Sequence, residues 1–384
     1  MTELLCKGTA NDREDILDFA NYVFSFDHEP HNFIEMVPRL YGPESASEAF
    51  HYLIRENGKI KAMVCSYPME TKVGEETLKL AFIGTVSVHP YSRGKGYMKR
   101  LMNAAIADMQ KDGTDLAALG GQRQRYQYFG FENGGIEYGF SFNRSNLRHA
   151  FKDVASPIKV VPLDEMGKEQ WDCAYSLFQR QHIHGIRNRE EFPAILHNWN
   201  GIPYALLADG EMKGYFSVGG KTFFEFVLGN EAELLPAVKS AMESLHMDRA
   251  VLKAADYEEK RLSLLSSVCE NSSIVCSSNY RIFHYDRVIS AYLKVKQSYS
   301  TLQEGSIILN IDGKQTAVEV RDGKITVGPV SPHLSAPVIS LGNLEAVEFL
   351  TAPFSPRRRE EARRFPFLQS WFPIPLYTAS LDEC

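Results

Sequence analysis

Two glycines separated by one residue stand between a strand-like run and a helix-forming run at residues 84–102, which read GTVSVHPYSRGKGYMKRLM. Glycine lets a ligand approach the backbone closely. The unpaired N–H groups in the first turn of the following helix attract anions, and the helix dipole adds to this attraction. Arg93, Lys95 and Lys99 supply positive charge. The segment therefore predicts a phosphate-binding loop, and a pyrophosphate is the ligand we expect.

This loop differs from two common phosphate-binding loops. The pattern GxxxxGK[ST] of nucleotide hydrolases is absent from the sequence. The dinucleotide pattern GxGxxG requires glycine where this chain has Lys99. A lone GxG is more often a structural turn, but here a strand and a proline precede it and a helix follows it. That context favours ligand binding over a turn.

The surrounding elements must hold this loop in place. Apolar spacing predicts a helix at 12–25, strands at 49–56, 59–67, 78–88 and 116–119, and a helix at 95–111. Asn57-Gly58 lies between the first two strands, which is a strong hairpin signal. Strand, turn, strand, helix and strand recur later in the chain, at 204–208, 209–210, 212–218, 231–245 and 250–254. The second copy is shorter and lacks the glycine-rich loop, so we expect a tandem repeat with one phosphate site.

The texture of the sequence changes beyond residue 286. Short strands separated by Asp-Gly turns are expected at 305–312, 316–322, 324–327 and 336–341, and a helix is expected at 344–350. The charge run at 357–364, RRREEARR, is interpreted as a solvated helical face. Residues 365–377 are rich in Phe, Trp and Pro, and we expect them to pack against the body of the protein.

The composition narrows the class of protein. A formal net charge of −6 argues against nucleic acid as the main partner. No apolar run approaches the length of a membrane span, and the N-terminus lacks the features of a signal peptide. Six scattered cysteines without a CxxC pair indicate a reducing compartment, so we expect a cytoplasmic protein. His182 and His184 have no ligand-type residue at metal spacing, and no metal site is predicted.

A second chemical motif, RYQYFGF at residues 125–131, lies about 30 residues after the loop. The order of strand, phosphate loop, helix, strand and Tyr-x-x-x-Gly-Phe resembles the Gcn5-related N-acetyltransferase (GNAT) superfamily over about residues 1–145. The resemblance implies that the cofactor is acetyl-coenzyme A. One position departs from the family, which usually has Gln or Arg where this chain has Tyr91.

The resemblance also implies the cofactor contacts. In that family the strand before the loop binds the pantetheine arm and the loop amides hold the pyrophosphate. The implied residues here are Val86, Ser87 and Val88 in the strand, Arg93, Gly94, Lys95, Gly96, Tyr97, Met98 and Lys99 in the loop and first helical turn, and Gly121 and Gln122 after the next strand.

The same resemblance makes Tyr126 the general acid that protonates the departing thiolate. Acetyl transfer needs an amine beside the thioester carbonyl, removal of the ammonium proton and a donor for the sulfur. A phenol with a pKa of about 10 can protonate a thiolate whose thiol has a pKa of about 8.5, although it is a weak acid for this task. Packing is the alternative role for Tyr126, and it is the role we assign to Tyr128.

The layout of the whole chain resembles the Eis (enhanced intracellular survival) acetyltransferases. We therefore expect an α/β (α+β) fold with two GNAT-like domains, each a mixed, mostly antiparallel sheet with flanking helices. A C-terminal α+β domain resembling sterol carrier proteins follows. The expected limits are 1–150 for the catalytic domain, 151–285 for the degenerate second domain and 286–384 for the third. The resemblance also implies a homo-oligomer, a hexamer.

In that family the chain's own terminal carboxylate serves as the base and an acidic residue precedes it. The corresponding residues here are Cys384 and Glu383. An α-carboxyl with a pKa of about 3.5 is a poor base unless burial raises that pKa, so action through water or attraction of a cationic substrate are alternatives. No histidine pairs with Cys384 in the sequence pattern, so we do not assign its thiol a nucleophilic role.

The resemblance further implies a substrate site at the end of the first helix, with Asp27 binding ammonium groups and Phe24 forming a wall. A solvated acid beside a core phenylalanine is the alternative. The predicted function is acetyl transfer from acetyl-CoA to primary amines of a polycation such as an aminoglycoside. The alternatives are a lysine or polyamine acetyltransferase, a longer-chain N-acyltransferase, and a non-catalytic CoA- or lipid-binding protein.

Overall fold

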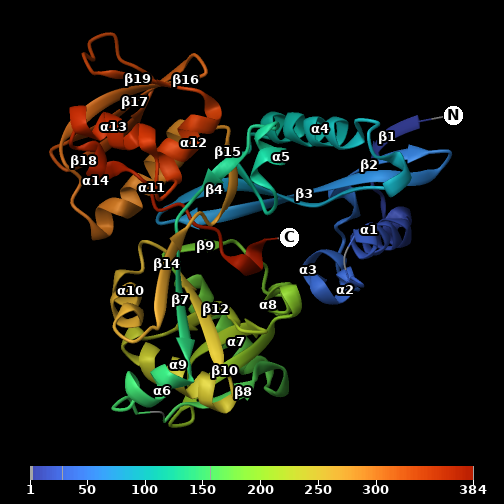
Figure 1. Ribbon diagram of the computed structural model, residues 1–384, viewed down its shortest axis with the longest axis vertical. Coiled ribbons are helices and arrows are strands. Elements are labelled where there is room, and N and C mark those ends of the chain that lie inside the picture. The colour runs from blue at the N-terminus through green and yellow to red at the C-terminus, as the bar shows by residue number, and fades with distance from the viewer. Residues whose placement is uncertain (1–2, 28, 156, 384) are drawn as a thin grey trace.

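The computed structural model describes residues 3–27, 29–155 and 157–383, and it gives no side chain for Asp27. Three hydrogen-bonded sheets of eight, seven and four strands form the frame of these residues (Figure 1). The fold is mixed α/β, as predicted. The C-terminal segment, red in Figure 1, returns to the region between the first and second sheets.

The first sheet carries the predicted phosphate loop. Its strand order is β1 (Glu3–Lys7), β2 (His51–Glu56), β3 (Lys59–Val73), β4 (Glu76–Val88), β5 (Leu116–Leu119), β15 (Ser278–Ile282) and β6 (Glu132–Gly134), and β9 (Ile183–Gly185) pairs with β3. Asn57 and Gly58 have φ of 50° and 82°, so they form the predicted tight turn between β2 and β3. β4 and β5 run parallel.

Alternate residues of β4 lie on opposite faces of this sheet, and both faces are buried. Ala81 and Ile83 pack with α4 (Tyr97–Lys111), whereas Leu80 and Phe82 belong to the core on the other face. The helices on that other face are α1 (Arg13–Asp27), α2 (Phe33–Met36) and α3 (Pro38–Tyr41) near the phosphate loop and α11 (Tyr285–Tyr299) at the far end. The predicted helices at 12–25 and 95–111 are confirmed as α1 and α4.

The second sheet repeats the plan of the first. Its strand order is β14 (Asn271–Val275), β7 (Glu137–Asn143), β13 (Arg249–Ala254), β12 (Thr222–Leu228), β11 (Glu211–Gly219), β10 (Ile202–Ala208) and β8 (Lys159–Pro162). β12 and β13 are parallel, and α9 (Leu234–Ser244) precedes β13 as α4 precedes β5. The predicted tandem repeat of strand, turn, strand, helix and strand is therefore confirmed. The remaining helices around these two sheets are α5 (Arg123–Gln127), α6 (Arg144–His149), α7 (Lys168–Gln179), α8 (Phe192–Leu196) and α10 (Glu259–Ser266).

The two sheets exchange strands across the predicted domain limits. β7 precedes residue 150 but pairs with β13 and β14 in the second sheet. β15 lies far along the chain but is inserted between β5 and β6 of the first sheet. The first sheet is therefore completed only after the second unit has been traversed. The limits at 150 and 285 stay predictions.

The third sheet has the order β18 (Lys324–Gly328), β17 (Lys314–Arg321), β16 (Gly305–Ile311) and β19 (Val338–Leu341). Its helices are α11, α12 (Asn343–Thr351), α13 (Pro356–Arg364) and α14 (Leu368–Trp371). Trp371 and Ile374 are fully buried, which confirms that the aromatic tail packs. The resemblance of this unit to sterol carrier proteins stays a prediction.

The interpretation of residues 357–364 as a solvated face is wrong in part. Arg358 is buried and donates hydrogen bonds to the carbonyls of Phe349 and Ala352 at the end of α12. Glu361 is buried as well and pairs with Arg357 at 2.9 Å. Arg358 therefore binds α13 to the end of α12, where the last carbonyls of the helix need hydrogen-bond donors. None of the helices in the described ranges is long and apolar enough to cross a membrane.

Candidate active site

A bulge in β4 sets the position of the site. Met63 on β3 faces Ser87 and Cys65 faces Gly84, so β4 carries an extra residue between these pairs. Thr85 lies in the bulge with φ of 48°, which is an unfavourable conformation for a β-branched residue. β5 ends at Leu119 opposite Ile83, so β4 continues beyond its parallel partner. Val86–Val88 therefore extend beyond β5, while Ser87 and Val88 still pair with β3 on the other edge of the strand.

A buried chain of hydrogen bonds holds this bulge. The Nδ1 atom of His51 lies 3.0 Å from the carbonyl of Ser47, so it carries the proton. Burial lowers the pKa of His51 to about 4, and the neutral ring therefore accepts at Nε2 from the Tyr41 hydroxyl, 2.9 Å away. The Tyr41 oxygen is left to accept from the Thr85 hydroxyl at 2.6 Å. The strained residue is thus fixed by its side chain.

The phosphate loop leads from this bulge into α4. Gly94 and Gly96 have φ of 83° and 76°, and a Cβ atom on either would meet nothing within 4 Å. The glycines are therefore required by the backbone conformation, and space is open above them. Gly96 is the N-cap of α4 and makes no side-chain cap hydrogen bond. The first-turn N–H groups of this helix remain suited to an anion.

The side chains of Lys95, Tyr97 and Lys99 are bound to other residues of the protein. The Lys95 Nζ atom lies 2.7 Å from Glu56 Oε1 on β2, and the Lys99 ammonium donates to the Tyr128 hydroxyl at 2.6 Å. Tyr97 is buried, and its hydroxyl bonds to Glu3 and Glu56. Any phosphate contact made by Lys95 or Tyr97 in this conformation is therefore through the main chain.

A cleft of about 480 Å³ opens beside the loop and collects several predicted residues. It is lined by Val23 and Phe24 from α1, Val86, Ser87 and Val88 from β4, Arg93, Met98 from α4 and Arg125 from α5. Six of these eight were predicted from the sequence, with Phe24 assigned to the substrate. Arg125 and Val23 were missed, although Arg125 directly precedes Tyr126 in the motif. The cleft therefore lies between the end of β4 that extends beyond β5 and the N-terminal end of α4.

Tyr126 lies at the inner end of α5 and is 7% exposed. Burial raises the pKa of its phenol, with Arg125 acting in the opposite direction, so the group stays protonated at neutral pH. Its ring lies against Gly121, because a Cβ there would be 2.7 Å from Tyr126 Cε2. Gln122 is the N-cap residue of α5. Gly121 and Gln122 thus shape the position of the phenol.

Tyr128 is not a packing aromatic. Its side chain is 67% exposed, and the Lys99 ammonium lies 5.0 Å from its ring centroid. The ring follows the last residue of α5 and points outward, whereas Tyr126 and Phe129 point into the core. The prediction missed this because alternating aromatics in a short turn give no indication of which ring faces the core.

The end of the chain reaches the segment that follows β5. Glu383 lines a groove of about 560 Å³ together with Gly120 and Gly121. Burial raises the pKa of Glu383 to about 8, opposed by Lys253 and reinforced by Glu137 and Asp382. Phe24 lines the cleft described above, so these two predicted substrate residues lie in separate cavities. The predicted base, Cys384, and the side chain of Asp27 lie outside the described residues.

No group of three or more His, Cys, Asp or Glu side chains is arranged to hold a metal ion within the described ranges. His184, which was considered as a ligand, instead faces the Gln181 carbonyl with Nδ1 at 2.7 Å.

Comparison with known proteins agrees with this geometry. Residues 6–134 match the family model described as acetyltransferase (GNAT) domain. No curated protein sequence matches the chain. Among solved structures, a conserved protein of unknown function and probable N-acyltransferase from Enterococcus faecalis V583 is similar with a TM-score of 0.69 at 16% identity, covering 98% of this chain and 97% of that one.

Two further structures are similar over the full length. A GCN5-related N-acetyltransferase from Kribbella flavida has a TM-score of 0.66 at 17% identity, covering 99% of this chain and 100% of that one. Eis1 from Mycobacterium abscessus has a TM-score of 0.62 at 12% identity, with 98% of each chain covered. At such identities the likeness establishes a common fold. The matched domain contains the cleft, the loop and Tyr126.

Proposed function

We propose that this chain transfers acetyl from acetyl-CoA to primary amines of a polycation such as an aminoglycoside. The match of residues 6–134 to an acetyltransferase (GNAT) domain supports acetyl transfer, and the fold over the full length is similar to that of Eis1. The observation that carries the proposal is the open, glycine-lined turn at the N-terminus of α4 beside the end of β4 that extends beyond β5. The division into three domains, the sterol-carrier-like third unit, the hexamer and the cytoplasmic location stay predictions.

The proposed cofactor site uses main-chain groups. The N–H groups of Gly94 through Lys99 would hold the pyrophosphate, and the backbone of Val86–Val88 would bind the pantetheine arm. The uncapped N-terminus of α4 and the empty space above both glycines fit an anion of this size. When bound, acetyl-CoA supplies the acetyl group as a thioester. Arg93 and Arg125 line the cleft with cationic side chains suited to its phosphates.

The proposed chemistry assigns one proton to each of two groups. Tyr126 donates its phenolic proton to the sulfur as the carbon–sulfur bond breaks, and its burial keeps that proton in place until then. The terminal carboxylate of Cys384, directly or through water, removes one proton of the acceptor ammonium, so that the free amine forms the new carbon–nitrogen bond. The nitrogen loses a second proton as the amide forms, and this proton replaces the one that Tyr126 gave to the sulfur. Glu383, Phe24 and Asp27 bind the acceptor.

A thiol-release assay tests the proposal. Acetyl-CoA is mixed with the full chain and with panels of aminoglycosides, linear polyamines and lysine peptides. We expect release of coenzyme A with at least one aminoglycoside, and loss of turnover when residues 383–384 are removed. Release only with lysine peptides or polyamines would contradict the substrate class. Full turnover by the shortened chain would contradict the role of the terminal carboxylate.

A further inference from the structure

A buried group of charges surrounds Asp382, two residues before the end of the chain. The side chain of Arg187 is fully buried, and its Nε donates to Asp382 Oδ1 at 2.8 Å. The other two nitrogens of this guanidinium donate to Glu225 at 3.1 and 2.7 Å. The Tyr215 hydroxyl donates to Glu225 at 2.6 Å. Arg187 therefore joins the tail to the second sheet.

Asp382 also faces the first unit. Nη1 of Arg39, on α3, lies 3.7 Å from Asp382 Oδ1 in an equally buried pair. Arg187 follows β9, which pairs with β3 of the first sheet. Two arginines thus lie beside Asp382, and the carboxylates of Asp382 and Glu225 together balance their two positive charges. The charge group sits where the tail and both GNAT-like units meet.

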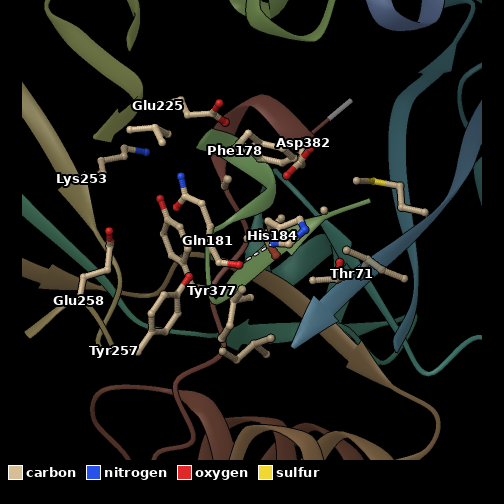
Figure 2. Close-up of a pocket in the computed structure, with 18 of the residues that line it drawn as sticks. Thr71, Phe178, Gln181, His184, Glu225, Lys253, Tyr257, Glu258, Tyr377 and Asp382 are labelled. Atoms are coloured by element: carbon tan, nitrogen blue, oxygen red, sulfur yellow. Dashed lines mark hydrogen bonds between the residues drawn. The ribbon is translucent and has the colours of Figure 1, made fainter. Parts of the chain in front are cut away.

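Neighbouring contacts hold the backbone of the same segment. The Leu381 carbonyl accepts from Asn198 Nδ2 at 3.0 Å, and the Leu381 side chain is fully buried. A Cβ atom at Gly185 would lie 2.8 Å from Asp382 Oδ2, so the Asp382 side chain packs closely against the end of β9. Figure 2 shows Asp382, His184 and Glu225 among the residues that line a cavity of about 80 Å³. The tail is therefore fixed up to Asp382.

Burial of this many charges is poorly explained by stability alone. Removing ions from water costs free energy that their attraction often fails to recover, and apolar side chains would fill the space at lower cost. Such groups can instead fix one arrangement, because an arginine fork binds a carboxylate in a defined geometry. The residue that follows Asp382 is Glu383, which lines the groove at Gly121. Consecutive Cα atoms are about 3.8 Å apart, so the position of Asp382 restricts the last two residues closely.

We propose that Arg187 is a positioning residue that binds Asp382 and thereby holds the last residues of the chain in the acyl-transfer site. The inference rests on the proposed function, in which the end of the chain acts on the acceptor. Arg187 lines neither the cleft beside α4 nor the groove beside Gly121. It acts by keeping Glu383 and the chain terminus in the groove beside Gly121.

Accessibility of the tail tests the inference without any assay of transfer. The full chain, Arg187→Gln and Asp382→Asn are treated with carboxypeptidase Y, and loss of C-terminal residues is followed by mass spectrometry. We expect residues 382–384 to be removed at least tenfold faster from both variants. Asp248→Asn is the matched control, because it removes a carboxylate paired with Arg144 at an exposed site of the second unit. Its digestion should equal that of the unchanged protein.

Kinetics then separate positioning from general damage. We expect both variants to lose at least tenfold in kcat while the KM for acetyl-CoA stays within twofold, since the cofactor cleft lies in the first unit. A tail as resistant as in the unchanged protein, or a KM that rises in parallel with the loss of kcat, would overturn the inference. If Arg187→Gln does not fold, Asp382→Asn decides, because asparagine has nearly the same shape. Absence of transfer in the unchanged protein would refute the proposed function and leave the digestion result valid.

Discussion

At the scale of single residues, burial makes both the Tyr126 phenol and the Glu383 carboxyl weaker acids. Burial raises the pKa of both groups. The consequences differ, because a phenol only becomes more firmly protonated at neutral pH whereas a carboxyl becomes able to titrate near it. Each residue therefore yields its own test.

Replacing Tyr126 with phenylalanine removes the proposed acid and keeps the buried ring. We expect kcat to fall about 10²-fold, which is the lower range for a general acid, with little change in the KM for acetyl-CoA. Steady-state thiol release measures both constants. Tyr128→Phe is the control, since it removes only an exposed hydroxyl that accepts from Lys99. Equal rates for Tyr126→Phe and the unchanged protein would show that Tyr126 only packs.

Glu383 predicts a pH dependence of stability. Its pKa is raised to about 8 in the folded chain from a usual value of 4.5, so the folded state binds a proton that the unfolded state has lost between these pH values. The stabilising contribution is therefore complete below pH 4.5 and is lost as the pH rises through about 8. The free energy of unfolding of the protein relative to Glu383→Gln should fall over this window by a few kcal/mol at most, since one pKa unit is about 1.4 kcal/mol.

Urea unfolding of both proteins at several pH values between 4.5 and 9 measures this difference. A difference that stays constant, or one that increases with pH, would mean that Glu383 is ionised in the folded chain at neutral pH.

The sequence predicted which residues line the cleft better than it predicted where the side chains around it point. Val86–Val88, Arg93 and Met98 were implied by the family resemblance, which rests on the order of strand, loop and helix. Lys95 and Lys99 were expected to add charge for phosphate, yet they pair with Glu56 and Tyr128. Glu56 lies across the sheet on β2, and no local pattern shows that β2 passes the loop.

At the scale of elements, the turn into α4 depends on two glycines in the left-handed region. Gly96→Ala introduces strain of about 1 kcal/mol, which the loop can relieve only by moving the N–H groups that face the phosphates. We expect the KM for acetyl-CoA to rise about tenfold and the melting temperature to fall by a few degrees.

Gly210→Ala is the matched control for this change. Gly210 has φ of 80° and open space around it, but it turns the hairpin of the second unit. It should lose a similar amount of stability and leave the KM for acetyl-CoA unchanged. A similar rise in that KM for both variants would mean that the α4 turn has no special role in binding.

Local elements followed from the sequence because their signals are local. Asn57-Gly58 and Asp209-Gly210 both supply positive φ for a tight turn, and both hairpins formed as expected. The exchange of β7 and β15 between sheets could not be predicted, because pairing partners separated by about 160 residues leave no mark in periodicity. Arg358 was likewise misjudged, since its acceptors are carbonyls of another helix.

At the scale of the whole molecule, the chain returns to its own first unit. The third unit lies beside the first sheet, and the tail passes from it through buried Leu376 and Leu381 to the junction of both GNAT-like units (Figure 1). A site assembled in this way is complete only when all three units are folded. The composition gave no indication of this closure, and only the family resemblance pointed to it.

The central claim is that acetyl-CoA occupies the cleft between the end of β4 that extends beyond β5 and the N-terminus of α4. A crystal structure of the chain with coenzyme A tests it most directly. The account predicts the pyrophosphate on the amides of residues 94–99 and the pantetheine arm along Val86–Val88, with its sulfur near the Tyr126 hydroxyl. Coenzyme A bound elsewhere, or a turn at Gly94–Gly96 that stays closed to it, would contradict the account.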